Sequence, residues 1–159
     1  MKIIGITGFA RAGKDTYARQ LQKKYQQESP LWNTQIYSLS DALKVEMSRR
    51  VYMRFGVSSF TEDEHDKATI RPLLVKAAMA RRREDENYWI KKLTKQINND
   101  HPDVAIITDI RFENEARWVK RFGGKIVRVR RADIVAANKT EAENDKLIDP
   151  FVDEWIENQ

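Results

Sequence analysis

The sequence has 159 residues, of which 41% are hydrophobic, enough for one sizeable core and too few for two comfortable domains. It contains no cysteine, which excludes disulfides, thiolate catalysis and Cys-ligated zinc. We expect neither a membrane span, which needs a run of about 18 apolar residues, nor a signal peptide. We therefore expect a cytoplasmic protein.

The net charge of +5 suggests an anionic partner, although a basic solvated surface would give the same number. The basic residues are spread along the chain, with no zinc-finger spacing and no aromatic RNA-binding motif. Nucleic acid is therefore not the favoured partner. A phosphorylated small molecule explains the charge equally well.

The first third of the chain predicts two strands and two helices. Residues 2–7 are rich in isoleucine and predict a buried strand that Gly8 ends. A helical period follows over residues 14–27. Residues 34–39 predict a second strand, and Ser38-x-x-Asp41 resembles a capping box that opens a helix.

The middle of the chain predicts helices and one further strand. Residues 56–67 are polar and irregular, which indicates a mobile segment. Pro72 is expected in the first turn of the next helix, which ends at an arginine cluster. Asn87 is expected to cap another helix. Residues 104–107 form an unbroken apolar run, mostly β-branched, and predict a strand buried on both faces.

The last third predicts a helix over residues 113–122, closed by Gly123-Gly124. Strands are expected over 126–129 and 151–156. Alternating strands and helices, two of the strands uniformly apolar, predict an α/β fold with a five-stranded parallel sheet covered on both faces. Ligands of such sheets bind at the carboxyl ends of the strands, where Gly8 and Asp109 lie.

The segment between the first strand and the first helix has the pattern of a phosphate-binding loop. Its glycines permit backbone angles that turn successive N–H groups toward phosphate oxygens, and its lysine adds a positive charge. A plain strand-turn-helix without a ligand is the alternative. The residues expected to bind ATP are Gly8, Ala10, Arg11, Ala12, Gly13, Lys14, Asp15 and Thr16.

The loop departs from the commonest pattern, which has Ser or Thr directly after the lysine. Here Asp15 takes that position and the hydroxyl follows at Thr16. A Gly-Lys-x-Thr sequence is usual in nucleoside monophosphate kinases. Thr16 would bond a phosphate, and Asp15 would either assist Mg²⁺ or cap the helix start.

Asp109 and Arg111 form the second candidate element. A carboxylate at the end of a buried strand is where phosphate-loop enzymes hold Mg²⁺, although turns also favour Asp. Arg111 would either clamp an acceptor phosphate or pair with Glu113 or Glu115. We expect Asp15, Thr16 and Asp109 to be the metal ligands.

Residues 8–16, 37–44, 108–115 and 123–128, with the arginine-rich stretch leading to Tyr88-Trp89, resemble the bacteriophage deoxynucleoside monophosphate kinases. The resemblance covers nearly the whole chain in order. It implies a three-layer α/β/α P-loop kinase fold that transfers the γ-phosphoryl group of ATP to a deoxynucleoside monophosphate. It also implies Mg²⁺ as cofactor and Lys14, Asp109 and Arg111 as catalytic residues.

The chain departs from that family in two places. Residues 138–141, Asn-Lys-Thr-Glu, stand where the family has His-x-Ser-Glu. In the family a base-contacting loop and a helix follow the last strand, whereas this sequence stops at Gln159. The family pattern therefore does not indicate how adenine is held.

The remaining basic residues have two interpretations each. The cluster 81–83 would bind the acceptor phosphate or complement a helix dipole. Arg128 and Arg131 would belong to a lid that closes over the phosphates or lie in solvent. The tryptophans would pack in the core, with Trp89 the candidate for stacking on a base. The residues expected at the acceptor are Lys44, Arg82, Arg83, Trp89 and Arg111.

We expect one P-loop domain over residues 1–159. Its core would comprise about residues 1–40 and 100–159, with a helical acceptor-binding insertion over about 40–99. Its partners would be the two nucleotides, and a homodimer is an open alternative. The rival functions are a kinase for another small acceptor and a non-catalytic module that binds nucleotides or nucleic acid.

Overall fold

The computed structural model describes residues 1–158 and consists of five strands, six α-helices and one short 3₁₀ helix. The strands are β1 (Lys2–Thr7), β2 (Thr34–Tyr37), β3 (Val104–Ile107), β4 (Lys125–Arg131) and β5 (Glu154–Asn158). The helices are α1 (Lys14–Glu28), α2 (Leu39–Phe55), α3 (Glu64–Glu84), α4 (Tyr88–Asp100), α5 (Glu113–Arg121) and α6 (Lys139–Ile148), with the 3₁₀ helix at Asp149–Phe151. None of these helices is both long and apolar enough to cross a membrane.

The five strands form one sheet in the order β2-β3-β1-β4-β5, and every neighbouring pair is parallel. This confirms the predicted five-stranded parallel sheet. All four residues of β3 are buried, as are the last five of β1. All of these residues except Thr7 lack a polar side chain, because helices cover both faces of the central strands.

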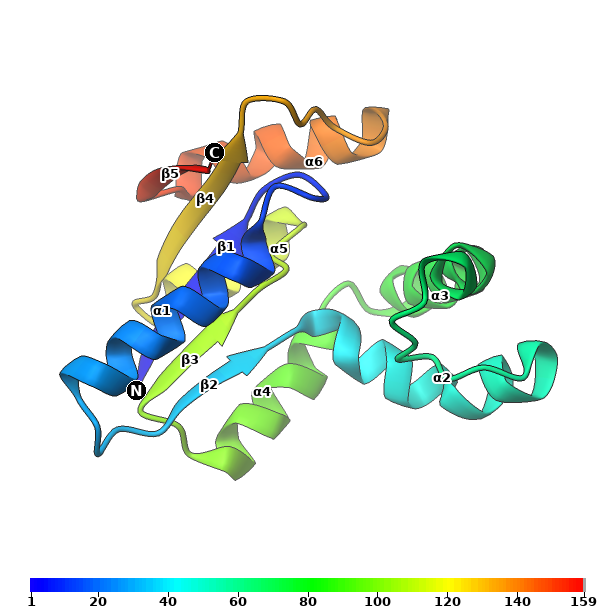
Figure 1. The fold of residues 1–159 in the computed structure, drawn as a ribbon, viewed down its shortest axis with the longest axis horizontal. Coiled ribbons are helices and arrows are strands. Elements are labelled where there is room, and N and C mark those ends of the chain that lie inside the picture. Colours follow the sequence, from blue (N-terminus) through cyan, green and yellow to red (C-terminus); the bar gives the residue numbers. More distant parts are fainter. Residues whose placement is uncertain (159) are drawn as a thin grey trace.

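Helices cover the two faces unequally, which gives a three-layer α/β/α arrangement (Figure 1). On one face α1 packs through Ala18, Tyr17 and Leu21 against alternate residues of the central strands. On the other face α4, α5 and α6 build the larger core around Leu93, Val119 and other apolar side chains. The predicted layers are therefore confirmed.

Helices α2 and α3 project from the β2 side of the sheet as a separate helical lobe (Figure 1), which we define as residues 39–84. Its inner side is apolar, with Leu43, Met47 and Val51 of α2 buried together with Ile70 of α3. The helix that follows, α4, packs onto the sheet instead, with its tryptophan and isoleucines inward. The projecting lobe is thus shorter than the predicted insertion.

The prediction for Pro72 was wrong, because this residue lies inside α3 rather than in its first turn. The helix begins eight residues earlier, where the Asp63 side chain accepts a hydrogen bond from the Asp66 N–H at 2.9 Å. Acidic residues in the first turn add to this start signal. The irregular segment therefore ends at Asp63.

Helix α6 had no predicted counterpart. Asn138 caps it by accepting a hydrogen bond from the Glu141 N–H at 2.9 Å. Only Ile148 of this helix is buried, so its apolar periodicity is weak. A polar helix of ten residues gives little signal of the kind that predicts helices from sequence.

Candidate active site

The loop after β1 has the backbone geometry of an anion cradle. Gly8 and Gly13 have φ angles of 145° and 94°, and Arg11 adopts a left-handed φ of 67°. A Cβ at Gly8 would approach the Val129 carbonyl oxygen to 2.4 Å, and one at Gly13 would approach Asn158 Nδ2 to 2.1 Å. Both positions therefore require glycine.

The Lys14 side chain folds back over this loop. Its Nζ donates hydrogen bonds to the carbonyl oxygens of Gly8 at 2.8 Å and Phe9 at 2.9 Å. Gly13 precedes α1 as its N-cap, so the positive end of the helix dipole lies beside the ammonium. The loop thus brings together the backbone, dipole and side-chain features that bind phosphate.

Several charged side chains surround Lys14. Burial is the main cause that lowers the pKa of its ammonium, and the nearby Arg111 guanidinium lowers it further. The carboxylates of Glu141, Asp15 and Asp109 raise the same pKa. The predicted residues Asp15, Asp109 and Arg111, which are far apart in the sequence, are therefore brought together around the loop lysine.

Asp109 anchors the start of the helical lobe. Its carboxylate accepts hydrogen bonds from Ser38 Oγ at 2.7 Å, the Leu39 N–H at 2.7 Å and the Ser40 N–H at 3.0 Å. The two N–H groups belong to the first turn of α2 and Ser38 is its N-cap, a place where a negative charge is also favoured by the dipole. Both carboxylate oxygens of the predicted metal ligand are thus engaged by the protein.

The residues at the start of α1 fit a bound Mg²⁺ better than Asp109 does. Asp15 and Thr16 are exposed at the entrance to the phosphate loop. Within residues 1–158 no group of three or more His, Cys, Asp or Glu side chains is arranged to hold a metal. Mg²⁺ is commonly held by one or two carboxylates, substrate phosphates and water, and Asp15 would supply one such carboxylate, with the Thr16 hydroxyl next to it in the chain.

Arg111 is exposed at the carboxyl edge of the sheet. Its backbone N–H and that of Phe112 donate to one oxygen of Glu115 at 2.7 and 3.0 Å. The other predicted partner, Glu113, pairs with Arg117. The Arg111 guanidinium makes no ion pair within residues 1–158, so its donors remain free for a ligand.

Arg82 is used by the protein itself. Its guanidinium stacks on Phe112 at 3.7 Å and donates to Asn114 Oδ1 at 3.2 Å and the Glu86 carbonyl oxygen at 3.1 Å. It also lies 3.9 Å from Glu115. These contacts join the end of α3 to the segment that carries Arg111.

The other predicted acceptor residues lie in different surroundings. Arg83 is exposed at the end of α3, and the Lys44 ammonium lies over the Phe60 ring at 5.7 Å. Trp89 is only 6% exposed and donates from its indole N–H to the Ala78 carbonyl oxygen at 3.3 Å. We therefore assign Trp89 to packing and do not carry it into the acceptor site.

The two predicted lid arginines also differ. Arg128 is buried in β4 and pairs with Asp145 and with Asp149 at 2.9 Å. Arg131 is exposed and pairs with Asp133 at 2.9 Å. Arg128 is thus committed to holding α6 against the sheet, whereas Arg131 remains accessible at the sheet edge.

Two functional candidates lay outside the sequence prediction. Glu141 Oε1 accepts a hydrogen bond from the Ala10 N–H of the phosphate loop at 2.8 Å. Asp41, half-buried at the start of α2, lies near the loop carboxylates, and burial raises the pKa of its side chain. The sequence marked Glu141 as the last residue of segment 138–141 and Asp41 as part of a capping box, but their approach to the loop depends on the fold.

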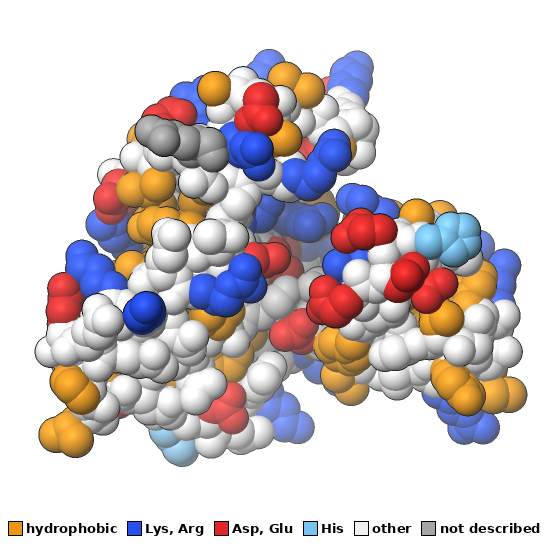
Figure 2. Space-filling view, viewed as in Figure 1, with side chains coloured by type: hydrophobic (Ala, Val, Ile, Leu, Met, Phe, Trp, Pro, Cys, Tyr) orange, Lys and Arg blue, Asp and Glu red, His pale blue; other side chains and the backbone are white. Residues whose placement is uncertain are grey.

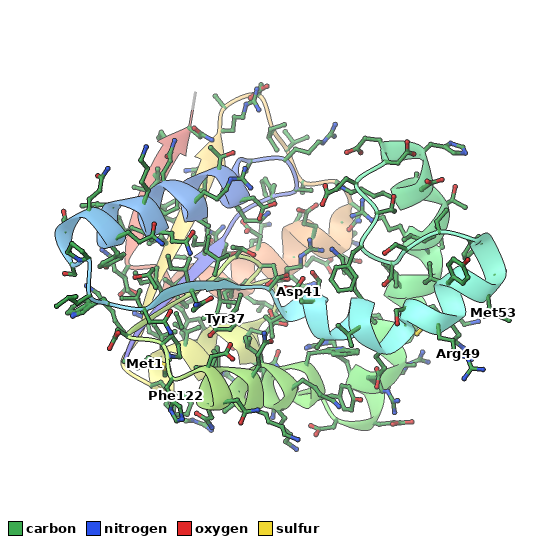
Figure 3. The ribbon with its side chains drawn as sticks, turned by 60° about the horizontal axis from the view of Figure 1, so that its bottom comes forward. Met1, Tyr37, Asp41, Arg49, Met53 and Phe122 are labelled. Carbon is green, nitrogen blue, oxygen red and sulfur yellow. The ribbon has the colours of Figure 1, made fainter. Side chains whose placement is uncertain are left out.

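The space between the sheet and the helical lobe is hollowed, with Lys/Arg and Asp/Glu side chains along its walls (Figure 2). Asp41 stands at the sheet end of α2, with Arg49 and Met53 toward its far end (Figure 3). A cavity of about 360 Å³ lies beside the phosphate loop. Its lining includes Asp15, Arg19, Gln22, Tyr37, Ser38 and Asp41.

The family model for phosphomevalonate kinase matches residues 6–124, which include the phosphate loop, the helical lobe and the Asp109–Glu115 segment. The chain belongs to the phosphomevalonate kinase family. With its phosphate loop and parallel sheet, this family member has a P-loop kinase fold. No curated protein sequence matches it.

Two solved structures resemble this phosphomevalonate kinase family member. TT1252 from Thermus thermophilus is 16% identical, with a TM-score of 0.50 over 99% of this chain and 88% of that one. Kti12 from Chaetomium thermophilum, solved in complex with ADP-AlF₃, is 14% identical, with a TM-score of 0.43 over 98% and 88%. TT1252 supports the fold alone. The family model and the TT1252 structure support the P-loop kinase part of the predicted resemblance, but neither of them is a bacteriophage deoxynucleoside monophosphate kinase.

Proposed function

We propose that the protein transfers the γ-phosphoryl group of ATP to the phosphate of a deoxynucleoside monophosphate. The observation that carries this proposal is the phosphate loop with Lys14 folded over it, near enough to the Arg111 guanidinium for that charge to lower the pKa of the Lys14 ammonium. One cation belongs to the loop that binds the donor phosphates. The other is exposed near the loop and makes no ion pair within residues 1–158, so it is available to bind an acceptor phosphate.

Each residue of the site has a separate role in phosphoryl transfer. The loop N–H groups and Lys14 hold the β- and γ-phosphates of ATP, and Arg111 orients the acceptor phosphate. Asp15 and Thr16 would hold Mg²⁺, which neutralises charge on the phosphates. The acceptor phosphate is already ionised at neutral pH, so no side chain has to remove a proton. Arg83, Arg131 and Lys44 remain candidates for further phosphate contacts.

Asp109 acts as a positioning residue in this scheme. It ties the start of the helical lobe to the edge of the sheet where transfer would occur. The lobe can therefore close over the acceptor only around this fixed point. Closure would exclude water that otherwise hydrolyses ATP.

The chemistry of the cleft favours a nucleotide over other phosphate esters. The residues that line the cavity beside the loop include the acidic Asp15 and Asp41 and the polar Gln22 and Tyr37, with Arg19 as their one cation. A neutral base can hydrogen-bond to such groups. A carboxylate on the acceptor would be repelled by the two acidic side chains.

The second candidate acceptor is phosphomevalonate, which the family description favours. It is also a phosphate monoester, so the same loop and Arg111 would serve it. It differs by carrying a carboxylate, which the acidic lining disfavours. The choice between the two therefore depends on the cleft and not on the phosphate site.

The test is acceptor-dependent release of ADP at millimolar ATP and Mg²⁺. The acceptors are dAMP, dGMP, dCMP, dTMP and phosphomevalonate, and hydrolysis without acceptor is subtracted. We expect turnover with at least one deoxynucleotide and little with phosphomevalonate. The reverse preference would reassign the acceptor, and no turnover with any of the five would refute the kinase proposal.

A further inference from the structure

An internal carboxylate occupies a backbone donor of the phosphate loop. Glu141 Oε1 accepts from the Ala10 N–H at 2.8 Å, and Oε2 accepts from the Ala137 N–H at 2.6 Å. Glu141 lies in the first turn of α6. One side chain thus connects the loop to the segment that leads into α6.

The same carboxylate lies close enough to Lys14 to raise the pKa of its ammonium. Glu141 therefore reaches two of the groups with which such a loop binds phosphate, a backbone N–H and the lysine charge. A phosphate oxygen at the Ala10 N–H would need the position that Glu141 Oε1 fills. Two anions sharing this partly shielded place would repel each other strongly.

The far end of α6 is held independently of the loop. Arg128, buried in β4, pairs with Asp145 and with Asp149 at 2.9 Å. The first turn of α6 has no comparable buried anchor, since Ile148 is its only buried residue. Loss of the Glu141 contact would therefore free the beginning of α6 while its end stayed on the sheet.

We propose that Glu141 is an internal competitor of the ATP phosphates, which must displace its carboxylate from the Ala10 N–H before they can occupy the loop. Displacement releases residues 132–141 from the loop and lets this segment rearrange over the bound nucleotide. The inference rests on the proposed function in taking ATP as the ligand. It adds a residue to the phosphate site and couples phosphate binding to the mobility of α6.

The rival role for Glu141 predicts the opposite sign. If its carboxylate shaped the loop for phosphate, removing the charge would weaken ATP binding. If it competes, removing the charge strengthens binding. The direction of the change in affinity therefore separates competition from structural support.

Glu141→Gln is the decisive variant, because glutamine keeps the size but has one acceptor oxygen and no charge. Glu143→Gln is its matched control, since Glu143 is exposed on the same helix and pairs only with Lys139 at 3.8 Å. Titration calorimetry measures the dissociation constants of ATP, ADP and inorganic pyrophosphate. We expect E141Q to bind ATP about tenfold more tightly than the parent chain, and E143Q to differ by about twofold or less.

Hydrogen exchange gives a second readout that does not depend on a variant folding well. ATP should accelerate exchange at Ala137 and its neighbours in the parent chain and leave exchange at residues 145–149 unchanged.

Glu141→Asp, whose side chain is too short to reach both N–H groups, should bind ATP more tightly than the parent chain, as E141Q is expected to do. Unchanged or weaker ATP binding by both variants would overturn the proposal, as would exchange at Ala137 that ATP leaves unaltered.

The outcomes also distinguish this inference from the proposed function. ATP binding that tightens in E141Q without turnover on any acceptor would refute the kinase proposal and support the role of Glu141. Turnover on an acceptor, together with an ATP affinity of E141Q equal to that of the parent chain, would support the kinase proposal and refute the role of Glu141. If the parent chain and E141Q bind neither ATP nor pyrophosphate, both are wrong.

Discussion

Glu115 offers a pH-dependent test of how Arg111 is held. Its side chain is 4% exposed, and one of its oxygens accepts from the N–H groups of Arg111 and Phe112. Burial is the main cause that raises the pKa of this carboxyl from 4.5 to about 7, and the nearby Asp109 charge adds to it. The two backbone hydrogen bonds and Arg82 oppose the rise.

The size and sign of the effect of pH on folding stability follow from the raised pKa of Glu115. A pKa raised from 4.5 to about 7 corresponds to about 3 kcal/mol of unfolding free energy. Below pH 4.5 the folded and unfolded chains are both protonated at Glu115. As the pH rises to about 7, the unfolded chain releases the proton first, so the folded state loses stability, and the loss levels off above that pH.

Glu115→Gln should remove this dependence while keeping the local structure. Because both backbone N–H groups donate to a single oxygen, the amide oxygen of glutamine can accept from both. Urea unfolding of the two chains at several pH values would measure the difference. We expect the stability of the parent chain relative to E115Q to fall by about 3 kcal/mol between about pH 4.5 and pH 8.

Glu113→Gln is the control, because Glu113 lies on the same turn but pairs with Arg117 near the surface. The unfolding free energy of E113Q should change with pH in the same way as that of the parent chain. Parallel curves for E115Q and the parent would show that Glu115 titrates as an ordinary carboxyl. The reasoning from burial would then be refuted.

Three further changes probe the site. Lys14→Ala should lower kcat by at least about 100-fold with an unaltered circular dichroism spectrum, and retained activity would remove the loop from the mechanism. Arg111→Ala should raise the KM for the acceptor and leave the KM for ATP nearly unchanged; a rise for ATP alone would place Arg111 at the donor. Asp109→Asn should lower the unfolding free energy by about 1–3 kcal/mol, because an amide cannot accept all three of its hydrogen bonds; urea unfolding that matches the parent chain would contradict this anchoring role.

The sheet and the phosphate loop could be predicted because their signals are local. Residues 3–6 and 104–107 carry no polar side chain, a pattern typical of strands covered on both faces. The loop needs glycine at Gly8 and Gly13, because residues with a side chain rarely adopt their φ angles of 145° and 94°. Apolar runs and required glycines of this kind can be recognised in the sequence itself.

The contacts that organise the site could not be predicted, because they join residues far apart in the chain. Ala10 meets Glu141, and Ser38 meets Asp109, only through the order of the strands. Polar side chains carry no periodicity that reveals such partners. The buried setting of Arg128 was missed for the same reason, since a charge on a strand indicates exposure unless its partners are known.

Asp109 links the start of the helical lobe to the end of β3 and is not placed to act mainly as a metal ligand. A carboxylate that already accepts three hydrogen bonds has little capacity left for a metal. The bonds instead fix the start of α2 at the end of β3, two residues before Arg111. The helical lobe and the acceptor arginine therefore share one anchor, so closure of the lobe and placement of the acceptor phosphate depend on the same side chain.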